Sequence, residues 1–129
     1  MDRYVTDTQA LVKFMMGQKV FNERCHQAFL AADLGDNIII IPAIVLMEIL
    51  YLFKKNRIKI ALIQTEELLQ SKNYQCEPLS LEILKTAAEI SDIPELHDRL
   101  IAATARYLDI PLITNDPVIR KSGFIKILK

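Results

Sequence analysis

Apolar and polar positions along the chain form short β-type runs separated by longer stretches with helical spacing. Strands are predicted at residues 4–6, 38–41, 74–76, 112–114 and 124–128. Because the strands alternate with helices, the connections are crossovers and the sheet is expected to be mainly parallel. The continuous β-branched run Ile38–Ile41 is typical of a strand covered on both faces. The pattern therefore predicts an α/β protein, a three-layer α/β/α fold with a central, mainly parallel five-stranded sheet.

The stretches between these runs predict the helices. Helical spacing covers residues 8–14, 22–34, 42–55, 58–70, 81–90 and 95–108, and a short turn or helical segment follows at 117–121. Pro42 suits the first turn of its helix, and Ser80 is a good N-cap for the helix that starts at Leu81. A tight turn is expected at Asp109-Ile110-Pro111, between the helix 95–108 and the strand at 112–114.

The longest apolar run, Ile38–Phe53, raises the question of a membrane span. It has 16 residues, contains Pro42 and carries the charge of Glu48. A helix that crosses the hydrocarbon core needs about 20 apolar residues. The run is therefore expected to be a buried strand that leads into a buried helix.

Length, composition and charge narrow the class further. The 129 residues, of which 51% are apolar, are expected to form one domain that spans residues 1–129. The formal net charge is zero, so a nucleic-acid partner would have to be held by local basic patches. Cys25 and Cys76 have no metal-ligand spacing and follow no secretory leader, which favours reduced thiols in a cytoplasmic protein.

Four acidic residues are candidates for chemistry because of where they fall in the predicted elements. Asp7 ends one strand, Asp116 ends another, Asp98 lies in the first turn of a helix, and Glu48 is the sole charge in the apolar run. In a parallel sheet these positions all fall at the carboxyl edge, where ligands bind. For Glu48 alone, contact with solvent or a lysine is a structural alternative.

The four acids together favour a metal site. Two carboxylates about 4 Å apart repel each other by about 4 kcal/mol at an effective dielectric constant of 20. A bound divalent cation would remove that cost, and ligation by oxygen alone favours Mg²⁺ or Mn²⁺ over Zn²⁺.

Four motifs, in this order, resemble those of the PIN domain family, in particular the small VapC-like toxins of toxin-antitoxin pairs. They are Asp7-Thr8 before an apolar helix, IPAIVLMEILYL with Glu48, LHDRLIAATA with Asp98, and LITND with Thr114 and Asp116. The resemblance covers nearly the whole chain and implies a metal-dependent endoribonuclease that hydrolyses RNA phosphodiesters with Mg²⁺ or Mn²⁺.

The resemblance also implies roles for these residues. Asp7 and Asp98 would be the main metal ligands, and Asp116 would be a further ligand, directly or through water. Glu48 would complete the acidic set, and Thr114 would orient a carboxylate or a water. His97 is given no role. The implied partners are RNA, a second copy in a homodimer and a small antitoxin protein.

Positive charge around such a site is expected because RNA is a polyanion. Two basic clusters are candidates for RNA contact, although such a cluster is more often ordinary solvated surface, and Arg99 and Arg106 carry less weight. The clusters are Lys54, Lys55, Arg57 and Lys59, and Arg120, Lys121, Lys126 and Lys129.

Two other functions are alternatives for this pattern of acids. A phosphoaspartyl enzyme of the dehalogenase type needs a second Asp two residues after the first, and Gln9 occupies that position. A PIN domain that acts as a non-catalytic RNA- or protein-binding module stays open, although the loss of an acid would be its signature and all four are present.

Overall fold

Strands and helices alternate along the computed structural model, which describes residues 1–129. In chain order the elements are β1 (Asp2–Thr6), α1 (Thr8–Met15), α2 (Glu23–Asp33), β2 (Asn37–Pro42), α3 (Ala43–Lys54), α4 (Leu62–Leu68), β3 (Tyr74–Glu77), α5 (Leu81–Glu89), α6 (Leu96–Leu108), β4 (Leu112–Ile113) and α7 (Pro117–Arg120).

The sheet has four strands in the order β3-β2-β1-β4, and every neighbouring pair is parallel. The mainly parallel sheet is therefore confirmed, but the prediction of five strands was wrong. Residues 124–128 contribute only an isolated bridge between Leu112 and Ile127. The physical reason is the shortness of the adjacent strand. Because β4 has only two residues, it cannot form a longer hydrogen-bond ladder with residues 124–128.

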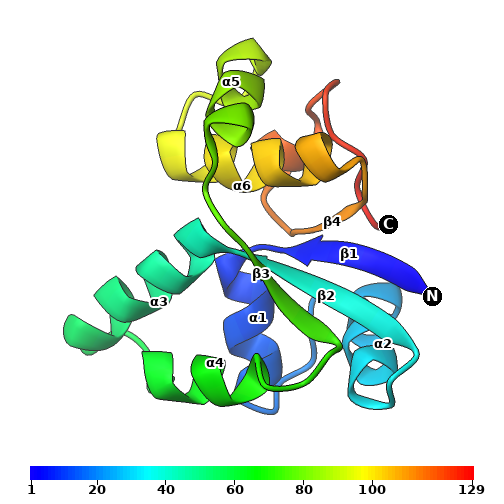
Figure 1. Cartoon of the computed structure of the whole chain (residues 1–129), viewed down its shortest axis with the longest axis vertical. Coiled ribbons are helices and arrows are strands. Elements are labelled where there is room, and N and C mark those ends of the chain that lie inside the picture. Colours follow the sequence, from blue (N-terminus) through cyan, green and yellow to red (C-terminus); the bar gives the residue numbers. More distant parts are fainter.

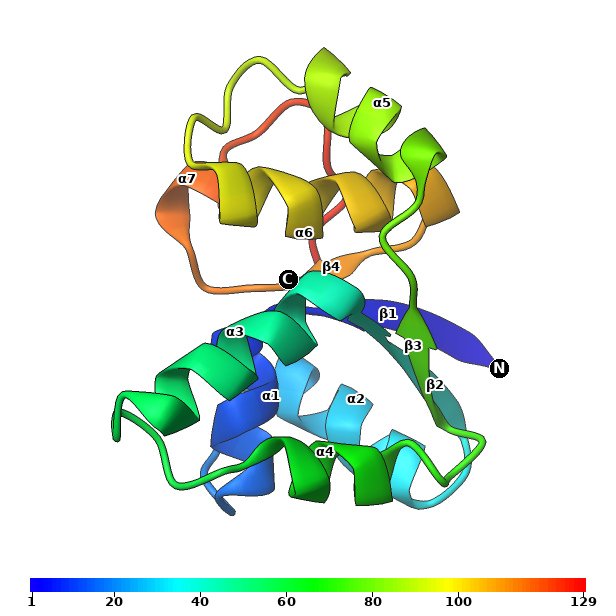
Figure 2. The ribbon, with the colours of Figure 1, turned by 60° about the vertical axis from the view of Figure 1, so that its left-hand side comes forward.

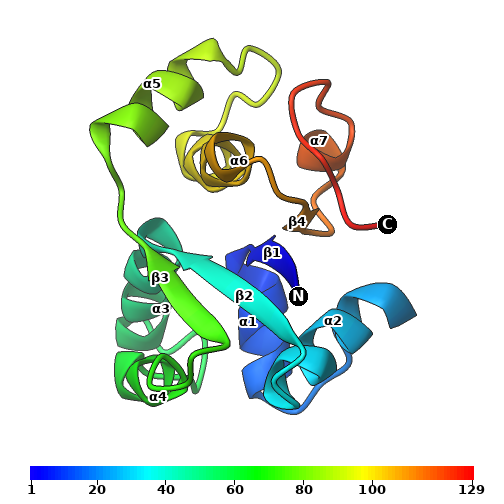
Figure 3. The same ribbon diagram turned by 45° about the vertical axis from the view of Figure 1, so that its right-hand side comes forward.

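Helices cover both faces of the sheet, as predicted. Helices α1 to α4 lie on one face, and α5, α6 and α7 lie on the other (Figures 1 and 3). Ile39, Ile40 and Ile41 of β2 are each at most 2% exposed and sit in a continuous core of 30 buried residues. Their burial matches the expectation of a strand covered on both faces, and it gives the site a rigid base.

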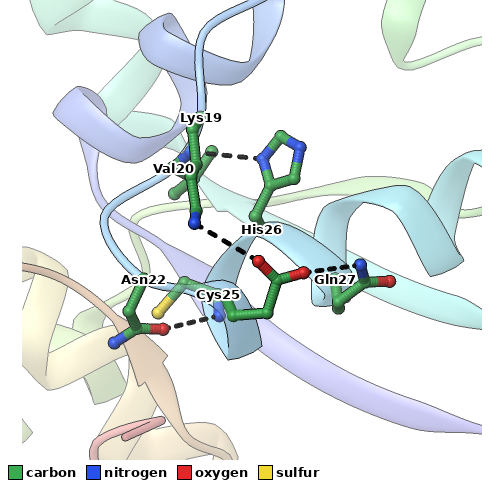
Figure 4. Close-up of polar contacts among 7 residues, drawn as sticks. Lys19, Val20, Asn22, Cys25, His26 and Gln27 are labelled. Atoms are coloured by element: carbon green, nitrogen blue, oxygen red, sulfur yellow. Dashed lines mark hydrogen bonds and ion pairs between the residues drawn. The ribbon is translucent and has the colours of Figure 1, made fainter.

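The start of α2 is fixed by its own local contacts (Figure 4). The Asn22 side chain accepts a hydrogen bond from the Cys25 N–H (2.9 Å), and Lys19 forms an ion pair with Glu23 (3.3 Å). The Val20 N–H donates to Nδ1 of His26 (3.2 Å). These contacts satisfy groups at the helix entry and fix where α2 begins.

Most helix boundaries agree with the sequence. Ser80 caps α5 by accepting from the Ile83 N–H (3.2 Å), and Asp109 ends α6 with a left-handed φ of 57°. The helix expected at 58–70 is shorter, because α4 begins only after Ala61. Pro42 ends β2 and precedes α3 instead of standing in its first turn. The length and composition of these helices rule out a membrane-crossing helix.

Candidate active site

The strand order places a topological switch point between β1 and β4. From β1 the chain builds the sheet outward through β2 and β3, and it then returns to place β4 on the other side of β1. In open parallel sheets, ligands bind at the carboxyl ends of the strands at such a point. Asp7 directly follows β1 and Asp116 lies three residues beyond β4, so two of the predicted acids lie there.

Asp7 is held by two hydrogen bonds and is almost fully buried, with 8% of its surface exposed. As the N-cap of α1, it accepts through Oδ1 from the Ala10 N–H (2.8 Å). Its Oδ2 accepts from the hydroxyl of Thr114 (2.7 Å). Both oxygens are therefore fixed in direction before any ligand arrives.

Thr114 connects two of the acids. Its buried hydroxyl donates to Asp7 and accepts from the N–H of Asp116 (3.2 Å). Asp116 caps α7 through Oδ1, which accepts from the Val118 and Ile119 N–H groups (2.9 and 3.1 Å). This arrangement leaves Oδ2 of Asp116 free to contact a ligand.

Glu48 projects from α3 and is half-buried. Its Oε1 accepts a hydrogen bond from the Thr8 hydroxyl (2.8 Å), so its partner is a neutral donor from α1 and not a lysine. Sequence reasoning missed this role of Thr8. The only signal was a hydroxyl residue next to Asp7, and the chain alone does not reveal which way that hydroxyl points.

Asp98 lies in the first turn of α6, as predicted, and is half-buried. The helix cap is a different residue, Glu95, whose side chain accepts from the Asp98 N–H (2.8 Å). The Asp98 carboxylate is therefore not needed to cap the helix and has both oxygens available.

One pocket of about 350 Å³ brings the four acids together. Figure 2 shows α7 beside the start of α6, with α3 below them; all three helices supply part of the pocket's walls. In this structure, no three side chains of His, Cys, Asp or Glu lie close enough together to hold a metal ion. The lining residues are Asp7, Thr8, Gln9, Glu48, Asp98, Ile101, Asn115, Asp116, Pro117 and Ile119.

Burial and mutual repulsion raise the pKa of two of these acids. The pKa of Asp7 is raised to about 6, mainly by burial; the hydrogen bonds from Thr114 and Ala10 oppose the rise, and the charges of Asp98 and Glu48 add smaller contributions to it. Burial also raises the pKa of Asp98 to about 6, helped by the charges of Asp116, Glu95 and Glu48. The pocket thus concentrates negative charge at a cost in free energy.

The donor set fits a hard divalent cation. All the candidate ligands are carboxylate oxygens, the type that Mg²⁺ and Mn²⁺ prefer, and no Cys or His lines the pocket. Asp98 keeps both oxygens, and Glu48 and Asp116 each keep one, outside the hydrogen bonds described above.

Several of the basic candidates have structural partners. Arg99 donates to the carbonyls of Ile93 and Pro94, and Arg106 donates to that of Phe124. Among the C-terminal cluster, the Arg120 guanidinium donates to the Thr114 carbonyl (3.1 Å), and Lys126 pairs with Asp109 (2.8 Å). In contrast, the side chains of Lys54, Lys55, Arg57 and Lys59 are exposed and form no ion pair.

Comparison with known proteins assigns the chain to a family. The family model of the PIN domain matches residues 4–125. No curated protein sequence matches the chain.

Solved structures with this fold include VapBC2 from Rickettsia felis (20% identity, 98% of this chain and 97% of that one, TM-score 0.71). VapBC from Salmonella typhimurium is similar (19% identity, 99% and 98% covered, TM-score 0.69). So is VapC20 from Mycobacterium tuberculosis, described as a Sarcin-Ricin loop cleaving toxin (14% identity, 98% and 99% covered, TM-score 0.66). With the family match over nearly its whole length and four acids in one pocket at the expected edge, the chain belongs to the PIN domain family.

Proposed function

We propose that this protein is a metal-dependent endoribonuclease and the toxin of a VapBC-type toxin-antitoxin pair. The observation that carries the proposal is the convergence of Asp7, Glu48, Asp98 and Asp116 on one pocket. Repulsion among four carboxylates is hard to explain by stability alone, and a divalent cation explains it.

Each residue has a role in this proposal. Asp7, Asp98 and Asp116 would hold the cation, Mg²⁺ or Mn²⁺, and Glu48 would complete the acidic set. When bound, the cation would supply Lewis acidity for phosphodiester hydrolysis. Thr114 fixes the direction of Asp7, and Thr8 fixes that of Glu48. These hydroxyls hold the carboxylates of Asp7 and Glu48 in a defined direction before a ligand arrives.

The toxin assignment is supported by the nature of the structural neighbours. Two are VapBC proteins crystallised with DNA, and a third is a Sarcin-Ricin loop cleaving toxin. By this analogy, the partners proposed here are an RNA substrate and a cognate antitoxin protein. The resemblance to VapC-like toxins further implies a second copy of the chain in a homodimer.

The test is cleavage of RNA by the purified chain with Mn²⁺ or Mg²⁺. We expect cleavage that stops on chelation and falls at least about 100-fold in Asp98→Asn and Glu48→Gln. Glu66→Gln is the matched control, because Glu66 is exposed on α4, outside the pocket. Equal activity in all four proteins would contradict the assignment.

The alternative is a PIN domain that binds RNA or protein without catalysis. One observation favours it: no three acids are close enough to hold a metal ion without movement. Under this alternative, the wild-type chain and Asp98→Asn would bind RNA equally well, and neither would cleave it.

A further inference from the structure

A second hollow adjoins the acidic pocket. Its volume is about 270 Å³, and we call it the Tyr51 pocket. It is lined by Met47, Glu48, Tyr51, Leu52 and His97. Glu48 lines both hollows. A linear polymer bound across the acids would therefore have its next monomer beside the Tyr51 pocket.

The walls of the Tyr51 pocket are largely apolar and aromatic, yet exposed. Tyr51 is 54% exposed and Met47 is 44% exposed, and the two are four residues apart on α3. The side chain of His97, at the start of α6, is 47% exposed. An exposed aromatic ring in a concave site is available to contact a ligand.

Positive charge stands beside the ring. The ammonium of Lys55 lies 5.8 Å from the centroid of the Tyr51 ring. Lys54, Arg57 and Lys59 are exposed in the same part of the chain. Sites for single-stranded nucleic acid combine an aromatic ring, on which a base stacks, with nearby cations that contact the phosphates.

We propose that the Tyr51 pocket binds one unpaired nucleobase of a single-stranded RNA, from the nucleotide next to the phosphate held at the acids. The base would stack on Tyr51 against the apolar side of Met47, and Lys55 would contact its phosphate. This proposal rests on the nuclease function and narrows its substrate to RNA that is unpaired at the cleavage position.

The main competitor for this hollow is a second copy of the chain. Two observations favour the nucleobase: the pocket shares the Glu48 wall with the acidic pocket, and the Lys55 ammonium lies 5.8 Å from the centroid of its Tyr51 ring. A homodimer contact buries apolar area and has no need of either feature.

Fluorescence can test the binding directly, because the chain has no tryptophan. Tyr51→Trp, in an Asp98→Asn background that prevents cleavage, places a single reporter in the pocket. We expect saturable quenching by a single-stranded oligoribonucleotide and little by the same sequence in a duplex. Tyr107→Trp is the control, because Tyr107 is 47% exposed on α6 and lines neither pocket.

Cleavage kinetics provide a second test of the Tyr51 pocket. Tyr51→Leu should raise KM for single-stranded RNA about tenfold with kcat within about twofold, because one base stack is lost. Tyr51→Phe keeps the ring and should restore KM, while Tyr107→Leu should match the wild type.

The outcomes separate the base site from the nuclease function. If the wild type cleaves but Tyr51→Leu keeps the wild-type KM, the base site is wrong and the nuclease stands. If the wild type does not cleave any RNA, the nuclease proposal fails and the quenching experiment alone decides the pocket. Tryptophan emission that depends on protein concentration, with Tyr51→Leu changing a dimer to a monomer by light scattering, would assign the pocket to a second copy and overturn the proposal.

Discussion

Replacing Asp7 by Asn should stabilise the metal-free protein at neutral pH. Folding moves the pKa of Asp7 from 3.8 to about 6, mainly because the carboxylate is buried. The charged form is therefore disfavoured in the folded state by about 3 kcal/mol, at about 1.4 kcal/mol for each pKa unit. Asn has the same shape and carries no charge, so it removes that penalty.

The hydrogen bonds reduce this gain. Asn remains a good N-cap, so the bond from the Ala10 N–H is expected to survive. The Thr114 hydroxyl, however, loses a charged acceptor, which costs about 1 kcal/mol. The expected net effect at pH 7.5 is a stabilisation of about 1 to 3 kcal/mol.

The sign of this effect depends on pH. The folded pKa of Asp7 lies above the unfolded value. Below pH 3.8 the carboxyl is protonated in both states, so the stability that the protonated form provides is fully present; it is lost as the pH rises through about 6. Asp7→Asn should therefore gain stability at pH 7.5 and gain nothing, or lose slightly, near pH 4. The acids whose pKa is lowered, such as Asp92 and Asp109, act on both proteins equally and cancel in the difference.

Urea denaturation at both pH values, with excess chelator, provides the measurement. Asp36→Asn is the matched control, because Asp36 is exposed and its side chain makes no hydrogen bond; it should change stability by less than about 0.5 kcal/mol. If Asp7→Asn destabilised the protein equally at pH 4 and pH 7.5, the account of a strained buried carboxylate would be wrong.

Three further predictions test the site and the core. Mn²⁺ at about 100 times its Kd should stabilise the wild type and Glu66→Gln by about 2.7 kcal/mol in thermal melts, and Asp98→Asn far less. Thr114→Val removes a hydrogen bond that lowers the pKa of Asp7, so the acid limb of the cleavage pH profile should move to higher pH, while Thr114→Ser should keep it. Phe29→Ala should cost about 3 to 5 kcal/mol in urea denaturation, because the ring is fully buried.

The positions of the acids could be predicted because strand ends are set by local pattern. The apolar runs that end at Thr6 and Ile113 fix where β1 and β4 stop, and parallel pairing puts both ends at one edge. The position of Asp98 could be predicted because the local pattern also indicates where its helix, α6, begins. Local pattern and long-range geometry agree at these positions, which is why sequence reasoning succeeded there.

Other features depend on tertiary packing that no local pattern encodes. The fifth strand was mispredicted because the residues at 124–128 have strand composition, whereas the ladder depends on the two-residue length of β4. The bond from Thr8 to Glu48 joins residues 40 positions apart and depends on how α1 packs against α3. Periodicity gives the face of a helix but not the partner that one hydroxyl will find.

The contacts of the pocket acids argue that their charge is kept available for a ligand. Elsewhere, two exposed acids are paired with lysines: Asp109 with Lys126, and Glu23 with Lys19. In the pocket, the partners of Asp7, Glu48 and Asp116 are hydroxyl and backbone N–H groups instead. Arg120 lies beside them, yet its guanidinium contacts the Thr114 carbonyl. Neutral donors fix the direction of a carboxylate without cancelling its charge, so the pocket keeps the negative potential that a divalent cation requires.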